Sequence, residues 1–402
     1  MSLLNVRLRR LAVVASIALA ASLLMPMSAG ATVNSATVIP SPNRAGVSNL
    51  LYSVSCPSAD SCVAVGVSGN SGGSATLVES WNGSVWSVVP SPAPGTNSQL
   101  DSVFCSSASA CIAVGWSDSG MASTTLVESW NGSSWSVIAS PNVGNSSNVL
   151  YSVSCTAPTS CIAVGATYGG PGWQTLVLSW NGTAWSVVSS PNVGSGSNYL
   201  LSVSCVSAVS CVAVGNAMSG VQETTLVLSW NGSVWSVVPS PNVGTGDNTL
   251  RSVSCVSSTT CVAVGDAVAG AQSYPLVESW NGSSWSIVPS PDLGSGLDIL
   301  ESVSCVGPSS CVAVGSDDVG SRYESLVMWW NGSTWLLVES PNPGSQNNVL
   351  HSVSCVSASS CVAAGFTYSS ALGETFVLSF TESMPPPAPT PSPDPVAPAF
   401  TG

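Results

Sequence analysis

The sequence predicts an all-β protein, a seven-bladed β-propeller with four antiparallel strands per blade. Seven copies of a unit of roughly fifty residues follow one another, a repeat length typical of propeller blades and solenoids. Each of the first six copies contains four short valine-rich runs bounded by turn residues, which predicts four strands. The last copy lacks its fourth run, and a matching run precedes the first copy.

A leucine opens each unit, at Leu51, Leu100, Leu150, Leu200, Leu250, Leu300 and Leu350. The unit reads Leu-x-Ser-Val-Ser-Cys, five residues, Cys-Val-Ala-Val-Gly, a variable stretch, then Thr-Leu-Val-x-Ser-Trp-Asn-Gly-Ser-x-Trp-Ser-Val-Val-Pro-Ser-Pro-Asn. Its runs are roughly four to seven residues long and β-branched, which suits strands and is too short for helices. We expect strands a, b, c and d in that order.

The turn between strands c and d contains Asn-Gly in the first six units. Asn-Gly is the strongest short signal for a hairpin, because both turn residues there adopt positive φ. Trp81 and Trp86 flank the first of these turns, and equivalent pairs flank the other five. We expect each pair to pack across or beside its turn.

The two ends of the repeat array complement each other. The seventh unit stops after strand c, at 375–380, whereas a spare strand d at 37–43 precedes the first unit and matches 87–92. We expect this N-terminal strand to complete the last blade and so close the ring. Closure hides the sheet edges that an open array would expose.

The fourteen cysteines form pairs that bracket the a–b turn of every unit. The pairs are Cys56 and Cys62, Cys105 and Cys111, Cys155 and Cys161, Cys205 and Cys211, Cys255 and Cys261, Cys305 and Cys311, and Cys355 and Cys361. Facing antiparallel strands bring such pairs to a distance that suits a disulfide. Zinc is the competing interpretation, but the chain has one histidine and no clustered second ligand pair. We expect disulfides, no metal site and no cofactor.

The ends of the chain differ in composition from the repeats. Residues 1–31 begin with three arginines, continue with an apolar run and end in Ala-Gly-Ala, the pattern of a cleaved signal peptide. The propeller then covers 32–383, and 384–402 form a Pro-rich tail that we expect to be disordered. We expect a secreted protein, extracellular or associated with the cell wall, without a membrane span.

The charge composition excludes several partners. Six basic residues stand against nineteen acidic ones, the net charge is −13, and the chain has no lysine. Nucleic acids and anionic membranes are bound through clusters of Lys and Arg that this chain lacks. We expect no nucleic acid partner, and a monomer.

The repeat resembles those of known propellers. Leu-x-Ser-Val-Ser, Ala-Val-Gly and Ser-Trp-Asn-Gly-Ser-x-Trp are similar to the repeats of Asp-box propellers, including photosystem assembly factors, more loosely to Kelch repeats, and most of all to uncharacterised repeat proteins secreted by actinobacteria. The resemblance covers 36–380, with Asn-Gly-Ser where the Asp-box has Asp-x-Gly and one residue fewer between Ser and Trp. It implies a propeller and leaves function open, because Asp-box hairpins are structural in sialidases, receptors and assembly factors alike.

Differences among the copies indicate a binding face. The a–b and c–d turns share one face and barely differ, whereas the d–a and b–c connections on the other face diverge. We expect the varied residues that follow the opening leucines to surround the channel mouth, namely Tyr52, Asp101, Tyr151, Leu201, Arg251, Glu301 and His351. To these we add six aromatic residues of the b–c loops, Trp116, Tyr168, Trp173, Tyr274, Tyr323 and Tyr368. Loops on a rigid scaffold commonly bind ligands, although an unconstrained loop would also vary.

These residue types favour recognition over catalysis. Aromatic and polar side chains around a mouth suit a neutral glycan or an extended peptide, so we expect a non-catalytic recognition or scaffold module that binds an extracellular glycan or protein. A Ser-His-Asp triad would have to use the single His351, without a Gly-x-Ser-x-Gly elbow. The alternative is a carbohydrate-active hydrolase or lyase that uses loop carboxylates such as Glu301 with Asp298, or Asp317 with Asp318, which could also hold Ca²⁺.

Overall fold

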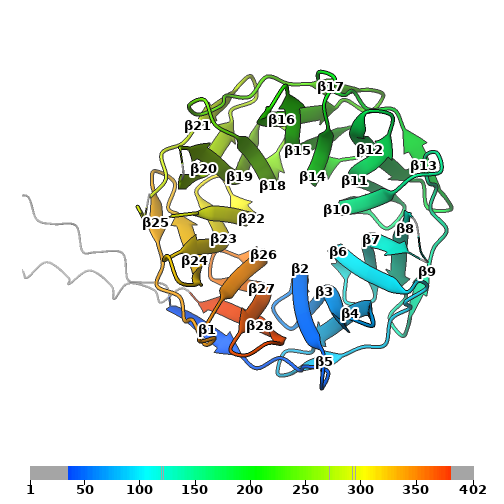
Figure 1. Ribbon diagram of the computed structural model, residues 1–402, viewed down its shortest axis with the longest axis vertical. Helices are drawn as coiled ribbons and strands as arrows, with labels where there is room; N and C mark the ends of the chain where they lie inside the picture. Colours follow the sequence, from blue (N-terminus) through cyan, green and yellow to red (C-terminus); the bar gives the residue numbers. More distant parts are fainter. Residues whose placement is uncertain are drawn as a thin grey trace, which may run out of the picture. The chain divides into compact units, whose positions relative to one another are not determined.

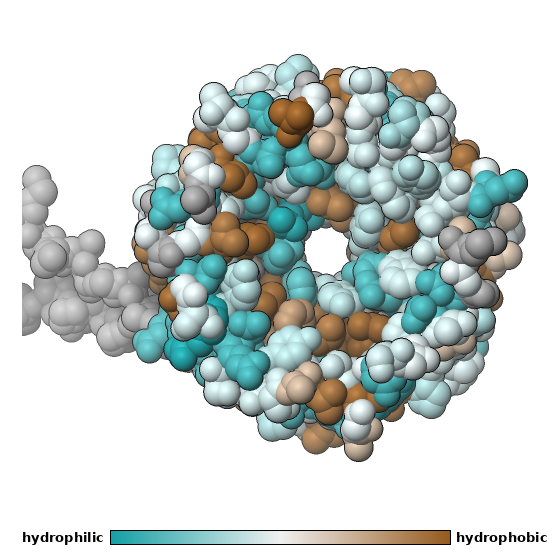
Figure 2. Space-filling model, viewed as in Figure 1, coloured by the Kyte–Doolittle hydropathy of each residue, from teal (hydrophilic) through white to brown (hydrophobic). Residues whose placement is uncertain are grey.

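The computed structural model describes residues 35–381, apart from 119, 121, 271, 292 and 295. The described residues form 28 strands, arranged as seven four-stranded blades in a ring (Figure 1). The space-filling view shows an open channel at the centre of this ring (Figure 2). The predicted all-β, seven-bladed propeller is therefore confirmed. The predicted signal peptide and the predicted Pro-rich tail lie outside the described residues.

Each blade consists of strands a to d from the channel outward (Figure 1). The innermost strands, a, are β2 (Ser48–Ser58), β6 (Asn97–Ser107), β10 (Asn148–Ala157), β14 (Asn198–Ser207), β18 (Asn248–Ser257), β22 (Ile299–Gly307) and β26 (Asn348–Ser357). Strands b are β3 (Ser61–Asn70), β7 (Ala110–Asp118), β11 (Ser160–Gly169), β15 (Ser210–Ser219), β19 (Thr260–Ala269), β23 (Ser310–Asp318) and β27 (Ser360–Tyr368).

The outer two strands follow the same order. Strands c are β4 (Gly73–Trp81), β8 (Ser123–Trp130), β12 (Gly172–Trp180), β16 (Gln222–Trp230), β20 (Gln272–Trp280), β24 (Tyr323–Trp330) and β28 (Gly373–Thr381). Strands d are β5 (Trp86–Val88), β9 (Trp135–Val137), β13 (Trp185–Val188), β17 (Trp235–Val237), β21 (Trp285–Ile287), β25 (Trp335–Leu337) and, at the N-terminus, β1 (Ser35–Ile39).

Strands b and c extend further than the sequence predicts. In the first blade Ser68 pairs with Ala75, and the last pair before the turn is Asn70 with Gly73. The prediction that the b–c stretches are loops is therefore wrong. Strand pairing continues because the alternating side chains still fit a half-buried sheet, a tertiary effect that local composition does not reveal. The varied residues consequently lie on rigid hairpin arms.

Strand β1 closes the ring as predicted. It pairs antiparallel with β28, from Ser35 opposite Thr381 to Ile39 opposite Val377. The strand begins two residues before the predicted segment and ends before Pro40, because proline has no amide hydrogen for the ladder. The two ends of the described propeller are thus held in one sheet.

Apolar side chains are buried between neighbouring blades. In one such layer, Leu200 and Leu226 of the fourth blade pack with Val164 and Val177 of the third. Seven equivalent layers occur around the ring, one for each junction between blades. Burial of these layers provides the main driving force for folding.

Serine side chains add a ring of hydrogen bonds around the channel. The first serine of Ser-Val-Ser accepts a hydrogen bond from the valine amide of the next blade, as Ser252 Oγ does from Val303 N at 3.1 Å. All seven junctions have this bond, including the one at which Ser352 Oγ accepts from Val54 N. The second serine bonds the following cysteine amide at six junctions. The innermost strands are therefore bonded into a closed circle.

All seven predicted cysteine pairs form disulfides, with Cα–Cα distances of 3.9 to 4.0 Å. The loop-entropy model gives about 2 kcal/mol for each such short loop. Disulfides of this number indicate that the chain folds in an oxidising environment.

The predicted hairpins between strands c and d are present, but their turns have four residues. Trp81 pairs with Trp86, and the Asn82 side chain accepts hydrogen bonds from the amides of Ser84 and Val85. The asparagine thus closes the turn through its side chain. The tryptophan rings pack at 5.8 Å, and Trp81 Nε1 donates to the carbonyl of Ala59 in the a–b turn. This bond places both turns on the same face of the ring.

Three buried glutamates interrupt the apolar layers. Glu79, Glu128 and Glu278 lie on strands c at a position that is leucine or methionine in the other four blades, and their side chains are fully buried. Within the described residues none of their carboxyl oxygens has a hydrogen-bond partner. Burial raises the pKa of each to about 8. The carboxyl groups are therefore mostly protonated at neutral pH.

These glutamates make stability depend on pH. The unfolded chain ionises near pH 4.5 and the folded chain near pH 8, so stability is greatest below pH 4.5 and is lost as the pH rises through this window. We expect the triple variant Glu79→Leu, Glu128→Leu and Glu278→Leu to gain stability at both pH values, because unpaired buried groups are removed, and to gain several kcal/mol more at pH 8 than at pH 4.5. Urea unfolding at both pH values measures the difference. Leu178→Glu introduces a buried glutamate at the equivalent position of the third blade and should make stability more dependent on pH. An equal gain in stability at both pH values in the triple variant would contradict this explanation.

Candidate binding site at the channel mouth

A β-bulge places one varied residue of each blade at the channel. In the first blade Leu51 pairs with Gly66 and Ser53 with Val65, so Tyr52 has no partner on β3. A bulge redirects the side chain of its extra residue. The same shift follows the opening leucine in every blade. The varied residues therefore sit at bulges within strands a, whereas the prediction had placed them at the strand starts.

The glycine that ends the Cys-Val-Ala-Val-Gly run, called the motif glycine below, makes this bulge possible. A Cβ atom at Gly66 would lie 1.9 Å from the carbonyl oxygen of Leu50, and the other six glycines meet the same backbone at 1.9 to 2.1 Å. Any larger residue would push strand a away from strand b. The repeated glycine thus fixes the geometry of the mouth.

An aromatic stack forms where the seventh blade meets the first. The ring of Tyr52 lies 5.3 Å from that of His351, which lies 5.3 Å from Phe366, and Phe366 lies 5.5 Å from Tyr368. Burial lowers the pKa of His351, so its imidazole is neutral at pH 7. Burial and the nearby Asp101 carboxylate raise the pKa of Tyr52 to about 12. This part of the mouth is uncharged and aromatic.

Asp101 of the second blade is an acid between two tyrosines. Gln99 Nε2 donates to its Oδ1 at 2.6 Å, whereas its Oδ2 is buried and has no hydrogen-bond partner among the described residues. Burial raises the pKa of Asp101 to about 7, against the effect of the Gln99 hydrogen bond. Its charge in turn raises the pKa values of Tyr52 and Tyr151. Asp101 is therefore a carboxyl group with spare hydrogen-bonding capacity.

Arg251 of the fifth blade is paired with two carboxylates. Its Nε donates to Asp266 Oδ1 at 2.7 Å, and its guanidinium lies 3.8 Å from Glu301 of the sixth blade. Burial alone would lower the pKa of Arg251, but Glu301 and Asp266 raise it. The single charge of Arg251 is therefore shared between two carboxylates. Asp101 is not part of this pairing.

The structure connects some of the predicted b–c aromatic residues to this ring. Tyr368 belongs to the stack with His351, and Trp173 packs between Tyr168 at 5.6 Å and Tyr199 at 5.8 Å. Tyr168 is exposed.

The other three predicted aromatic residues have no described ring contact. Trp116 lies on β7 between Gln99 and Thr125, at the position that Asp266 and Phe366 occupy in their blades, and Tyr274 OH donates to the nearby Gln272. Tyr323 lies on β24 at the outer end of its hairpin. No described ring contact connects them to the bulge residues.

Four residues that take part in these contacts were not predicted, namely Gln99, Tyr199, Asp266 and Phe366. Gln99 and Tyr199 precede opening leucines, and Asp266 and Phe366 follow the motif glycines. These positions also vary among the copies, so the signal was present. The importance of this variation follows only from the strand register at the bulge, which brings both positions beside the mouth.

Three of the four predicted loop carboxylates have described partners. Glu301 faces Arg251, whereas Asp298 accepts a hydrogen bond from the Leu293 amide in the preceding connection. Asp318 accepts one from the Gly320 amide. Among the described residues no group of three or more His, Cys, Asp or Glu side chains could hold a metal ion. The same residues contain no helix long and apolar enough to cross a membrane.

Comparison with known proteins supports the fold. No family model and no curated protein matches the chain. Among solved structures, YCF48 bound to D1 peptide has a TM-score of 0.54 at 12% identity, covering 89% of this chain and 97% of that one. YCF48 from Cyanidioschyzon merolae has 0.52 at 14%, covering 86% and 98%. The WD40 β-propeller domain of Doa1 has 0.51 at 14%, covering 87% and 98%.

These identities establish similarity of fold alone. The chain is a β-propeller, and a channel is open at its centre (Figure 2). The resemblance to Asp-box and Kelch repeats remains a prediction.

The acidity of Asp101 can be measured directly. Because burial disfavours its charged form, we expect a ¹³C NMR titration to give a midpoint near pH 7 for this carboxyl group. Asp101→Asn should remove that titration and leave the other carboxyl signals unchanged. A midpoint close to about 4, the ordinary value for aspartate, would mean that the carboxyl group is well solvated.

Proposed function

We propose that this protein is a secreted, non-catalytic binding module that recognises an extended basic segment of a protein at its channel mouth. The observation that carries the proposal is Asp101, a buried carboxyl group with an unpaired oxygen near Tyr52 and Tyr151. A lysine or arginine side chain would supply the missing hydrogen bond, and tyrosine faces attract cations.

Other features support a cationic protein partner. The net charge of −13 favours association with basic molecules. The disulfides and the N-terminal sequence pattern support export, and we infer that the protein acts as a monomer. One similar propeller, YCF48, has a structure bound to D1 peptide, which supports the peptide as a class of ligand. A rigid mouth formed by bulges would reduce the entropic cost of binding.

The pH dependence of binding tests this proposal. We expect the protein to bind lysine- and arginine-containing peptides on an array and not to bind neutral peptides of equal length. For a selected basic peptide, the affinity should rise about tenfold from pH 6 to pH 8 as Asp101 ionises, because its pKa is about 7.

The control for this binding is a single substitution. Asp101→Asn preserves the shape of the side chain and should remove the pH dependence, as measured by isothermal titration calorimetry. Tyr274→Phe, outside the ring, should bind like the unchanged protein. Peptide retention that does not depend on basic residues, or an unchanged affinity in Asp101→Asn, would rule out this mode of recognition.

A neutral glycan is a second candidate ligand. The Trp173 ring, with Tyr168 and Tyr199 on either side, offers aromatic surface on which a sugar could stack. A glycan array probed with the protein and with Trp173→Ala distinguishes the two candidates. Selective glycan binding that Trp173→Ala removes and Asp101→Asn leaves intact would favour the glycan.

A further inference from the structure

The face opposite the mouth contains clefts between neighbouring blades. Three equivalent clefts lie beside the a–b turns, and their volumes are about 200 Å³ between the second and third blades, 230 Å³ between the third and fourth, and 10 Å³ between the fifth and sixth. In each cleft the disulfide of the later blade contributes both of its cysteines to the lining. Because the repeats are so similar, differences among the clefts can be traced to single residues.

The cleft between the second and third blades differs from the others through Phe104. This residue replaces the second serine of Ser-Val-Ser, which is kept in the other six units. In the next junction Ser154 Oγ accepts a hydrogen bond from Cys205 N at 3.0 Å. Phenylalanine offers no such acceptor, so the amide of Cys155 lacks the hydroxyl partner that its counterparts have. The N–H group of Cys155, a residue that lines this apolar cleft, is thus a backbone donor without that hydroxyl partner.

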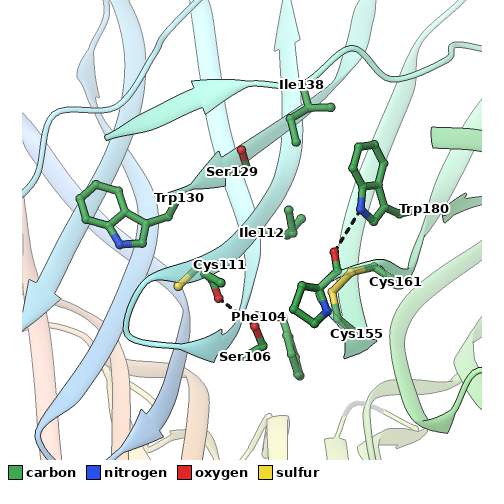
Figure 3. Close-up of a pocket in the computed structure, with 12 residues that line it drawn as sticks. Phe104, Ser106, Cys111, Ile112, Ser129, Trp130, Ile138, Cys155, Cys161 and Trp180 are labelled. Carbon is green, nitrogen blue, oxygen red and sulfur yellow. Dashed lines mark hydrogen bonds between the residues drawn. A yellow bond between two sulfur atoms is a disulfide. The ribbon is translucent and has the colours of Figure 1, made fainter. Parts of the chain in front are cut away.

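The lining of this cleft is mainly apolar (Figure 3). Phe104, Ile112 and Ile138 contribute from the second blade, and Trp180 and the Cys155–Cys161 disulfide from the third. Ile138 corresponds to valine in five other blades and to Ile39 in the seventh, so this wall is bulkier than in those five. The cleft between the third and fourth blades is instead lined by hydroxyl groups such as those of Ser154, Thr156 and Ser179.

The indole of Trp180 is held in place. Its Nε1 donates to the Pro158 carbonyl at 3.2 Å, so the wall of the cleft is fixed and its donor is occupied (Figure 3). The lining contains no charged side chain. A charged ligand would therefore lose its hydration without compensation.

We propose that this cleft binds a neutral single-ring aromatic molecule that carries a carbonyl or hydroxyl oxygen. An apolar cavity of about 150 Å³ is sufficient for benzene in another protein, so a cleft of 200 Å³ accommodates one ring with a small substituent. The ring packs against Phe104, Ile138 and Trp180. The oxygen accepts a hydrogen bond from the amide of Cys155.

Benzamide and toluene test the two parts of this proposal. We expect ¹H–¹⁵N NMR titration of the intact protein with benzamide to shift the Cys155 amide and the Trp180 indole signals saturably. Toluene, which lacks the acceptor, should bind about fivefold more weakly, because one hydrogen bond contributes about 1 kcal/mol. Equal affinities would contradict the role of the Cys155 amide.

Phe104→Ser is the matched control because it installs the residue present in the other six units. It should restore the bond to Cys155 and weaken benzamide binding at least tenfold, while the melting temperature shows that the variant folds. Ile138→Trp, which fills the cleft, should also abolish binding. No saturable shift up to the solubility of benzamide, or equal affinity in Phe104→Ser, would overturn the proposal.

Discussion

The structure depends on the hydrogen bonds that join each innermost strand to the next. A serine hydroxyl in one blade accepts from a valine amide in the following blade at all seven junctions, so the circle has no open end. Apolar layers between the blades provide most of the stability but are not directional. The hydrogen bonds fix the relative height of the strands, and with it the position of every bulge at the mouth.

Both proposed binding sites lie at positions where the sequence departs from the repeat. Asp101 occupies a bulge that holds tyrosine in two other blades, and Phe104 occupies a position that is otherwise serine. Both lie on β6, one toward the channel mouth and one toward the opposite face. The buried glutamates are departures of another kind, since they add a dependence on pH without facing a ligand site. In a protein built from nearly identical repeats, the residues that differ from the repeat are the first candidates for function.

Much of the fold could be predicted because the repeats confirm one another. The blade number, the disulfides and the closing strand follow from spacing and from the unmatched ends. The bulge could not be predicted, because it depends on strand register, and neither could the length of the b–c hairpins. For the same reason Phe366 and Asp266 were missed, although Tyr52 and Arg251 were found. Neighbours across blades are set by packing that a single repeat does not reveal.

Hydrogen exchange at the Val303 amide tests the central claim most directly. Ser252→Ala removes its acceptor, whereas Ser258→Ala, in the exposed a–b turn of the same blade, is a matched control. If the serine circle holds the inner strands, Val303 should lose at least tenfold of its protection in Ser252→Ala, and unfolding should cost about 1 to 3 kcal/mol less. Unchanged protection and stability in Ser252→Ala would show that the apolar layers alone hold the inner strands together.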